Sequence, residues 1–387
     1  MKRKIGIITM YHNSVNYGGV LQAYALTKVL NENGYKAEQI CFVGRMTERQ
    51  RLCTLFDFGI KRAIRQVWRN AKWIIKQPIK YIVKRQKART LVSNPLEAPF
   101  AAFRENCVPH SDIIYNSDNI KKANSKYDVF ITGSDQVWNF AWYNPIYFLD
   151  FASKDKKKIS YAASISMDSL NDKQRKVFKK SLKNYNAVSL REAESIPLIS
   201  DLSPVDPQFV LDPTLLLSRE DWSALAQKET EVDDYVFCYF IGNNQTERKI
   251  AKEFAEQHNM KLVGISHYHK CDELDIELSS AGPKEFLSYL KNAEYVFTDS
   301  FHAVVFSKIF EKQYFVFNRD NKGSMGSRIR TITSLFETED RFCFGERETL
   351  GYVESLTDID YGKELPEFEK KKKESIDFLL GALKEEK

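Results

Sequence analysis

The residues best suited to chemistry form the segment Thr298-Asp299-Ser300-Phe301-His302. An apolar run from residue 295 reads as a buried strand, and the three polar residues that follow it suit the cap of a helix. An almost uniformly apolar helix is expected over residues 303–310 and a strand over 313–317. His302 would then lie where a parallel strand ends and a helix begins, the edge at which such sheets bind ligands and helix N–H groups attract anions. We therefore predict that His302 acts on an anionic substrate, the alternative being a buried histidine with a structural partner.

A second polar segment, Asn16-Tyr17-Gly18-Gly19, lies in the first loop of the chain. A strand is predicted at 4–9, a helix at 20–33 and a strand at 35–43, which is a βαβ pattern. Two adjacent glycines allow backbone N–H groups to approach a ligand closely. The segment matches neither the dinucleotide-binding nor the phosphate-loop motif. Both a ligand cradle and a plain tight turn fit it.

A third polar cluster follows the strand predicted at 127–132. It offers hydrogen-bonding groups and one flat aromatic face, a mixture that commonly holds sugars, and it consists of Ser134, Asp135, Gln136, Trp138 and Asn139. The alternative is a capped helix start with a core tryptophan.

Arg191 comes directly after a strand predicted at 187–190, where a helix begins. A cation at this place opposes the helix dipole, which favours a functional role for it. The alternative is a structural ion pair with Glu192 or Glu194.

The length of 387 residues favours two domains, and the apolar fraction of 43% excludes general disorder. A stretch without helical period at 205–217, around Asp212-Pro213-Thr214, indicates the crossing between them. A second α/β pattern follows, with strands at 235–242 and 261–266 and helices at 246–259, 283–292 and 327–336. We predict an α/β protein with an N-terminal Rossmann-like domain at 1–210 and a C-terminal one at 211–365. The final helix, 366–387, is expected to pack back on the first domain.

The net charge of +6 is local, since residues 60–96 hold eleven Lys or Arg and no Asp or Glu. Within 60–91 the apolar residues recur at helical spacing, so a basic amphipathic helical insertion is predicted. Such a helix packs on its own domain or rests on anionic lipid headgroups. No nucleic-acid motif accompanies it. The sequence has no membrane span or export signal, and its six scattered cysteines are expected to be reduced, so we predict a cytoplasmic protein. If the basic helix rests on lipid headgroups, the protein would be peripheral at the inner membrane face.

Five short segments, in this order, resemble the polysaccharide pyruvyl transferase family. They are Asn16-Tyr-Gly-Gly-Val-Leu-Gln22, Asp128-Val-Phe-Ile-Thr-Gly-Ser-Asp-Gln-Val-Trp-Asn139, Ser189-Leu-Arg191, Asp212-Pro-Thr214 and Thr298-Asp-Ser-Phe-His302-Ala. The resemblance implies two Rossmann-like domains facing across a cleft, the GT-B arrangement. It also implies transfer of a carboxyvinyl unit from phosphoenolpyruvate to a sugar, which forms a pyruvate ketal and releases phosphate.

The family's essential histidine matches His302, its mid-chain arginine matches Arg191, and a downstream lysine matches Lys322. Many relatives carry Arg where this chain has Ser300, so Arg319, Lys322, Arg328 or Arg330 must replace that cation. We predict Arg191, His302 and Asp135 as catalytic residues. The predicted substrate-binding residues are Asn16, Tyr17, Gly18, Gly19, Ser134, Gln136, Trp138, Asn139, Asp299, Ser300, Lys322 and Arg328.

The chemistry of such a transfer agrees with these residue types. Arginine clamps carboxylate and phosphate groups, and histidine transfers protons near neutral pH. We hypothesise that His302 is an acid toward the donor and that Asp135 or Asp299 is the base toward the sugar. No cofactor, metal or nucleic acid is expected. The partners would be phosphoenolpyruvate as the donor and a saccharide as the acceptor, and one form of this hypothesis has the saccharide linked to a lipid. The alternatives are a nucleotide-sugar glycosyltransferase and a non-catalytic sugar- or anion-binding protein.

Overall fold

A computed structural model of the protein describes residues 3–44, 95–227, 230, 232–266, 269–319 and 326–384. The basic segment predicted at 60–91 and Lys322 lie outside the described residues. Among the helices that are described, none combines the length and the apolar character needed to cross a bilayer.

The first half of the chain is built on a parallel sheet with the strand order β2-β1-β3-β4. Its strands are β1 Lys4–Ile8, β2 Lys36–Gln39, β3 Val129–Thr132 and β4 Lys157–Ser160. Two short strands, β5 Ser189–Leu190 and β6 Gln208–Phe209, form a parallel pair that isolated bridges join to the β4 side. β3 is buried along its whole length, as expected of a parallel strand covered on both faces.

Helices cover this first sheet. They are α1 Tyr17–Glu32, α4 Glu97–Cys107, α5 Asp172–Leu182 and α6 Ile196–Ile199, with the 3-10 turns η1 Ile120–Ser125, η2 Pro145–Phe148 and η3 Ala193–Ser195. The side chain of Asn16 caps α1 by accepting a hydrogen bond from the N–H of Gly19. Gly34, at φ 86°, ends the same helix in the left-handed conformation that glycine adopts readily. The helix begins earlier than predicted, so both glycines of the first loop lie in its first turn.

The second half is a six-stranded parallel sheet with the order β12-β11-β10-β7-β8-β9. Its strands are β7 Tyr235–Tyr239, β8 Lys261–Ile265, β9 Ile276–Glu277, β10 Tyr295–Thr298, β11 Gln313–Phe317 and β12 Phe342–Cys343. The accompanying helices are α7 Arg219–Leu225, α8 Gln245–Gln257, α9 Pro283–Asn292, α10 Phe301–Ile309, α11 Gly326–Leu335 and α12 Leu350–Ser355, with the 3-10 turns η4 Pro213–Leu215, η5 Glu339–Arg341 and η6 Gly345–Arg347. The fold class is the predicted one: an α/β protein with two Rossmann-like parallel sheets.

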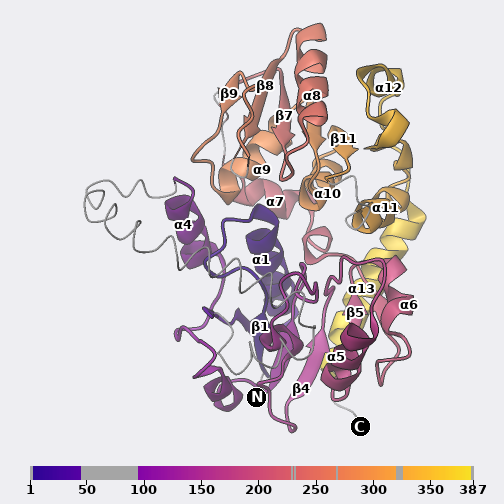
Figure 1. Ribbon diagram of the computed structural model, residues 1–387. Coiled ribbons are helices and arrows are strands. Elements are labelled where there is room, and N and C mark those ends of the chain that lie inside the picture. Colours follow the sequence, from indigo (N-terminus) through magenta and orange to yellow (C-terminus); the bar gives the residue numbers. More distant parts are fainter. Residues whose placement is uncertain are drawn as a thin grey trace, which may run out of the picture.

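The two sheets lie at opposite ends of the molecule, with α1, α7 and α10 between them (Figure 1). The Tyr17 ring stacks on Phe286 of α9 at a centroid distance of 4.5 Å. Its hydroxyl donates to the carbonyl of Ala281 at 2.5 Å. One apolar cluster runs through residues of both halves. The start of α1 is therefore held firmly against the second half.

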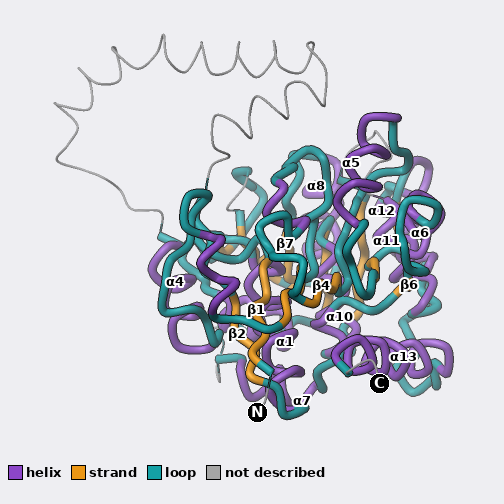
Figure 2. The backbone as a smooth tube through the Cα atoms, turned by 90° about the horizontal axis from the view of Figure 1, so that it is seen from below, coloured by secondary structure: helices purple, strands orange, loops and turns teal. Residues whose placement is uncertain are grey.

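The last helix, α13 Pro366–Leu383, returns to the first half of the chain (Figures 1 and 2). Ser375 accepts a hydrogen bond from the N–H of Leu211 at 2.9 Å. Near its end, the carbonyl of Leu383 accepts a hydrogen bond from Arg3 at 2.9 Å. The two ends of the described chain therefore lie side by side.

Candidate active site

His302 lies in the first turn of α10, beyond the carboxyl end of β10, and is 7% exposed. Ser300, which precedes the helix, makes no side-chain capping bond, unlike the expectation for this segment. A Cβ atom added to Gly18 would stand only 1.9 Å from Nδ1 of His302, so the imidazole rests directly on the first turn of α1. Glycine is required there because of this close approach. The histidine of the second half thus packs on the first loop of the first half.

Asp212 is the nearest charged partner of His302, with 3.6 Å between its Oδ2 and Nε2 of the imidazole. Ser134 and Arg191 donate hydrogen bonds to the same Oδ2 at 2.7 and 3.0 Å. The hydroxyl and backbone N–H of Thr214 donate to Oδ1 at 2.7 and 3.0 Å. Burial alone would raise the pKa of Asp212, but His302 and Arg191 hold it well below its usual range. The carboxylate therefore stays ionised although it is buried.

Arg191 is 2% exposed and lies among three carboxylates. Besides the bond to Asp212, its Nε lies 3.5 Å from Glu192 and its Nη2 lies 3.8 Å from Asp135. Its guanidinium stacks over the Phe301 ring at 4.4 Å. Burial opposes the charge, yet the three carboxylates raise the pKa of Arg191 above its ordinary value. Nε and Nη2 are nevertheless buried without a hydrogen-bond partner among the described residues.

Asp135 follows β3 with its backbone in the left-handed region, at φ 75°. Non-glycine residues in this region store strain, which is found most often at functional sites. Its Oδ2 lies 3.6 Å from where a Cβ of Gly19 would stand. The predicted catalytic residues Asp135, Arg191 and His302 are therefore neighbours at the start of α1.

Arg328, in the first turn of α11, brings a further positive charge to this cluster. It is 5% exposed, and burial together with the positive charges of Arg191 and Arg319 lowers its pKa to about 9. Arg319 lies 3.4 Å from Oδ2 of Asp299 and donates to the carbonyl of that residue at 3.1 Å. Two of the cations considered as replacements at Ser300 therefore do approach the site.

Asp299 is occupied by the backbone of the loop after β7. Its Oδ1 accepts from the N–H of Ile241 at 2.7 Å, and its Oδ2 accepts from the N–H of Gly242 at 2.6 Å. The same loop receives Arg248, whose guanidinium donates to the carbonyl of Gly242 at 2.8 Å. In this structure Asp299 ties two strand ends together.

The other predicted binding residues divide into two groups. Asn16, Gly18, Gly19 and Ser134 line or support the cluster. Tyr17 and Trp138 do not offer a face to a ligand, because each ring is buried in the core. Trp138 stacks on Phe148 at 5.4 Å and donates to the carbonyl of Tyr147, so the core-tryptophan alternative describes it.

Gln136 and Asn139 of the same segment bond to each other rather than to the cluster. The amide of Asn139 donates to the amide oxygen of Gln136 at 3.3 Å, and its own oxygen accepts from the N–H of Ala141. These contacts are those of a local turn.

Two residues that the structure places at the centre were not predicted there. Asp212 was placed at the crossing between domains and in one of the five segments that resemble the family, but it was given no role at the site. Glu192 appeared only as an alternative partner of Arg191, and it is fully buried, accepting from the hydroxyl of Ser164 and the N–H of Ile165. The available signal was the charge itself, since Asp212 directly follows a buried apolar stretch.

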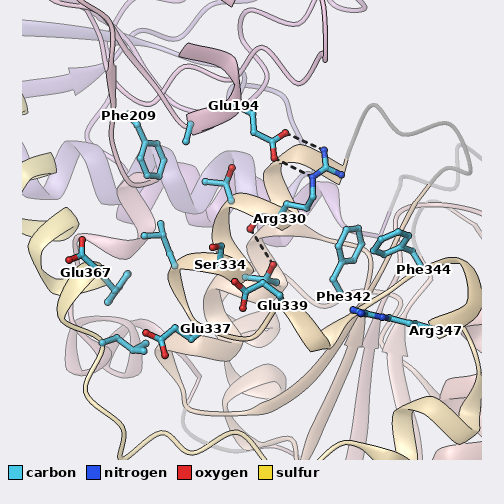
Figure 3. A pocket seen from close by; sticks show the side chains of 16 residues that line it. Glu194, Phe209, Arg330, Ser334, Glu337, Glu339, Phe342, Phe344, Arg347 and Glu367 are labelled. Carbon is cyan, nitrogen blue, oxygen red and sulfur yellow. Dashed lines mark hydrogen bonds and ion pairs between the residues drawn. The ribbon is translucent and has the colours of Figure 1, made fainter. Parts of the chain in front are cut away.

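A cavity of about 730 Å³ lies beside α11 and is lined by Phe209 from the first half, Phe342 from the second and Phe368 of α13 (Figure 3). The ion pair of Arg330 with Glu194, 3.2 Å at both contacts, stands in its wall. Arg330, one of the four cations considered as a replacement at Ser300, lines it, whereas the residues predicted as catalytic do not. The cavity and the His302 cluster are thus separate features.

Comparisons with known proteins agree with this architecture. The chain is similar over 98% of its length to a UDP-GlcNAc 2-epimerase of Methanocaldococcus jannaschii, solved in complex with UDP-GlcNAc and UDP, at 14% identity and a TM-score of 0.57, with 99% of that chain covered. A UDP-N-acetylglucosamine 2-epimerase from Rickettsia bellii matches at 12% identity and a TM-score of 0.50, covering 98% of this chain and 96% of that one. These similarities support the GT-B-like fold alone. The comparison with curated proteins found no match.

The family model for polysaccharide pyruvyl transferase matches residues 16–321. The match begins at the cap of α1 and contains Asp135, Arg191, Asp212 and His302, the residues that the fold brings together. The chain therefore belongs to the polysaccharide pyruvyl transferase family and is a transferase.

Proposed function

We propose that the protein transfers pyruvate from phosphoenolpyruvate to a sugar of a surface polysaccharide precursor as a ketal. The observation that carries this proposal is the state of Arg191, whose Nε and Nη2 are buried without hydrogen-bond partners among the described residues, beside His302. Buried polar groups are nearly always hydrogen-bonded. An anionic ligand with several oxygens would supply the missing acceptors.

The anionic groups of phosphoenolpyruvate suit the arginines at this place. It is a small, dense anion whose carboxylate and phosphate each match the planar fork of an arginine. Burial and like charge already disfavour the positive charge of Arg328, and the negative charge of a bound anion would offset both effects. Arg319 and Arg328 would replace the cation that many relatives carry at the position of Ser300. Lys322, proposed as a further contact, lies outside the described residues.

The reaction needs two hydroxyl groups of the sugar and one proton for the donor. His302 as an acid would deliver a proton to the enol methylene, which becomes the methyl group, while one hydroxyl oxygen bonds to the adjacent carbon. The second hydroxyl would then displace phosphate from that carbon and close the ketal. The hydroxyl protons would pass to a base and the departing phosphate. Asp135 is the better candidate base than Asp299, because both oxygens of Asp299 already accept backbone N–H groups.

The acceptor in this proposal is a lipid-linked saccharide at the inner face of the membrane. The support is the basic, periodic sequence of residues 60–91, which suits contact with anionic headgroups. Co-sedimentation with anionic and neutral vesicles tests this part. Equal binding to both, or to neither, would leave the insertion as ordinary packing.

The donor is tested by isothermal titration of the protein with phosphoenolpyruvate, UDP and GDP in parallel. We expect binding of phosphoenolpyruvate, and binding of a nucleotide alone would favour a glycosyltransferase instead. Release of phosphate from phosphoenolpyruvate in the presence of a panel of saccharides then separates an enzyme from a binding protein. Binding without release across the panel would favour the latter.

A further inference from the structure

Asp212 is fixed in place before His302 is considered. Its carboxylate accepts four hydrogen bonds from three separate segments, donated by Ser134, Arg191 and Thr214. The residue is 1% exposed and caps the 3-10 turn η4. A carboxylate held by so many donors has one orientation, so it can act as a fixed reference for a neighbouring ring.

The imidazole of His302 is fixed by two different contacts. The position of a Cβ on Gly18 would be 1.9 Å from Nδ1 and 2.4 Å from both Cγ and Cε1. Because the two carbons bonded to Nδ1 are only slightly farther away than Nδ1 itself, Gly18 faces the flat side of the ring. The lone pair of Nδ1, which lies in the ring plane, therefore points past Gly18 and not into it. Gly18 sets the plane of the ring, and Asp212 sets which edge faces inward.

The two ring nitrogens consequently have different environments. Nε2 is buried, faces the Asp212 carboxylate at 3.6 Å and has no hydrogen-bond partner among the described residues. This separation is longer than a hydrogen bond, and such contacts commonly shorten when substrate binds. A carboxylate can only accept, so a neutral imidazole beside it carries its proton on Nε2. Nδ1 then holds the free lone pair, beside the start of α1, where helix N–H groups favour an anion.

We propose that Asp212 is the positioning residue of His302 and that Nδ1 of His302 is the atom that transfers the proton. The imidazolium would donate from Nδ1 to the substrate and return to the neutral form with its remaining proton on Nε2, facing Asp212. Asp212 keeps its charge throughout and touches no substrate. The part that concerns the proton transfer rests on the proposed function, whereas the tautomer of His302 does not.

The experiment is a long-range ¹H–¹⁵N correlation spectrum of full-length protein labelled at histidine, recorded at alkaline pH. His302→Gln assigns the signals of this ring among the six histidines. We expect the Nε2–H tautomer in the wild-type protein, and the Nδ1–H tautomer would overturn the proposal without any turnover measurement. This reading needs no variant of Asp212 to fold.

Asp212→Asn then tests the positioning role, with Thr214→Val as the control that removes one donor to the carboxylate but keeps its charge. We expect Asp212→Asn to shift the His302 tautomer toward Nδ1–H and to lower kcat by at least about 10²-fold, whereas Thr214→Val keeps the wild-type tautomer. An unchanged tautomer in Asp212→Asn would overturn the positioning role. A protein with the expected tautomers but no phosphate release from phosphoenolpyruvate would contradict the proposed function and leave the assignment of the ring intact.

Discussion

Replacing Gly18 by alanine puts one methyl group where the His302 ring now lies. The new Cβ would be 1.9 Å from Nδ1, whereas ordinary contact begins at 3.4 Å, so the ring or the helix must move by about 1.5 Å. A displacement of this size at a catalytic group lowers turnover by roughly 10²-fold. The free energy of unfolding should fall by about 0–2.5 kcal/mol, since overpacking costs about 1–3 kcal/mol and alanine in a helix returns about 0.5–1 kcal/mol.

The assay is phosphate release from phosphoenolpyruvate, with the saccharide that best supports wild-type turnover, alongside thermal unfolding. Gly381→Ala is the matched control, because Gly381 is also helical and a Cβ there meets no atom within 4 Å. We expect Gly381→Ala to keep full turnover and to be slightly more stable. If Gly18→Ala also keeps full turnover, the packing of His302 on α1 does not matter to the reaction and the reasoning is wrong.

Four further predictions concern the site and two contacts outside it. His302→Ala should lower turnover by about 10²–10⁴-fold while the thermal transition stays cooperative, measured by phosphate release and calorimetry. Arg328→Met should weaken the binding of phosphoenolpyruvate by about 10–100-fold in titration calorimetry, since a charge-assisted bond contributes about 1.5–3 kcal/mol. Burial, and then the charge of Asp299, raises the pKa of Glu247 from 4.5 to about 9. The folded state therefore keeps this proton to a higher pH than the unfolded state, and the free energy of unfolding of the wild-type protein should fall as pH rises between those values. Denaturant titrations at several pH values should show a flatter slope for Glu247→Gln. Glu194→Arg or Arg330→Glu alone should each lower the free energy of unfolding by about 1 kcal/mol. The two changes together reverse the ion pair at the cavity wall and should restore the loss, measured by thermal unfolding.

The fold was predictable because its signals are local. Short apolar runs that alternate along the chain with amphipathic helices mark each βαβ unit. α9 and β11 have the bounds that their sequence predicts. α5 was not predicted, since its buried Val177, Phe178 and Leu182 are few and spaced among lysines. Its capping box at Asn171 and Gln174 was the signal that could have found it.

The site was predictable only in part, because its contacts are not local. Every polar residue that follows a parallel strand is a candidate site residue. The sequence does not show which of these side chains face the site and which pack in the core. Trp138 and Asp135 stand three positions apart in one motif, but one packs in the core and the other turns toward Arg191. The role of Asp212 depends on three donors that lie 78, 21 and 2 residues away. A buried carboxylate of this kind becomes visible only when the chain has folded around it.

These contacts also make the geometry of the site depend on the arrangement of the two halves. His302 belongs to the second half of the chain, Arg191 and Ser134 belong to the first, and Asp212 lies in the segment that joins the two halves. Asp212 contacts all three residues. A rotation of one half against the other would therefore change the distance between the Asp212 carboxylate and Nε2 of His302. Closure of the halves around a bound anion would shorten that 3.6 Å separation toward a hydrogen bond and complete the acid only when substrate is present. In this arrangement the distance from Asp212 to His302 depends on how closely the two halves approach each other.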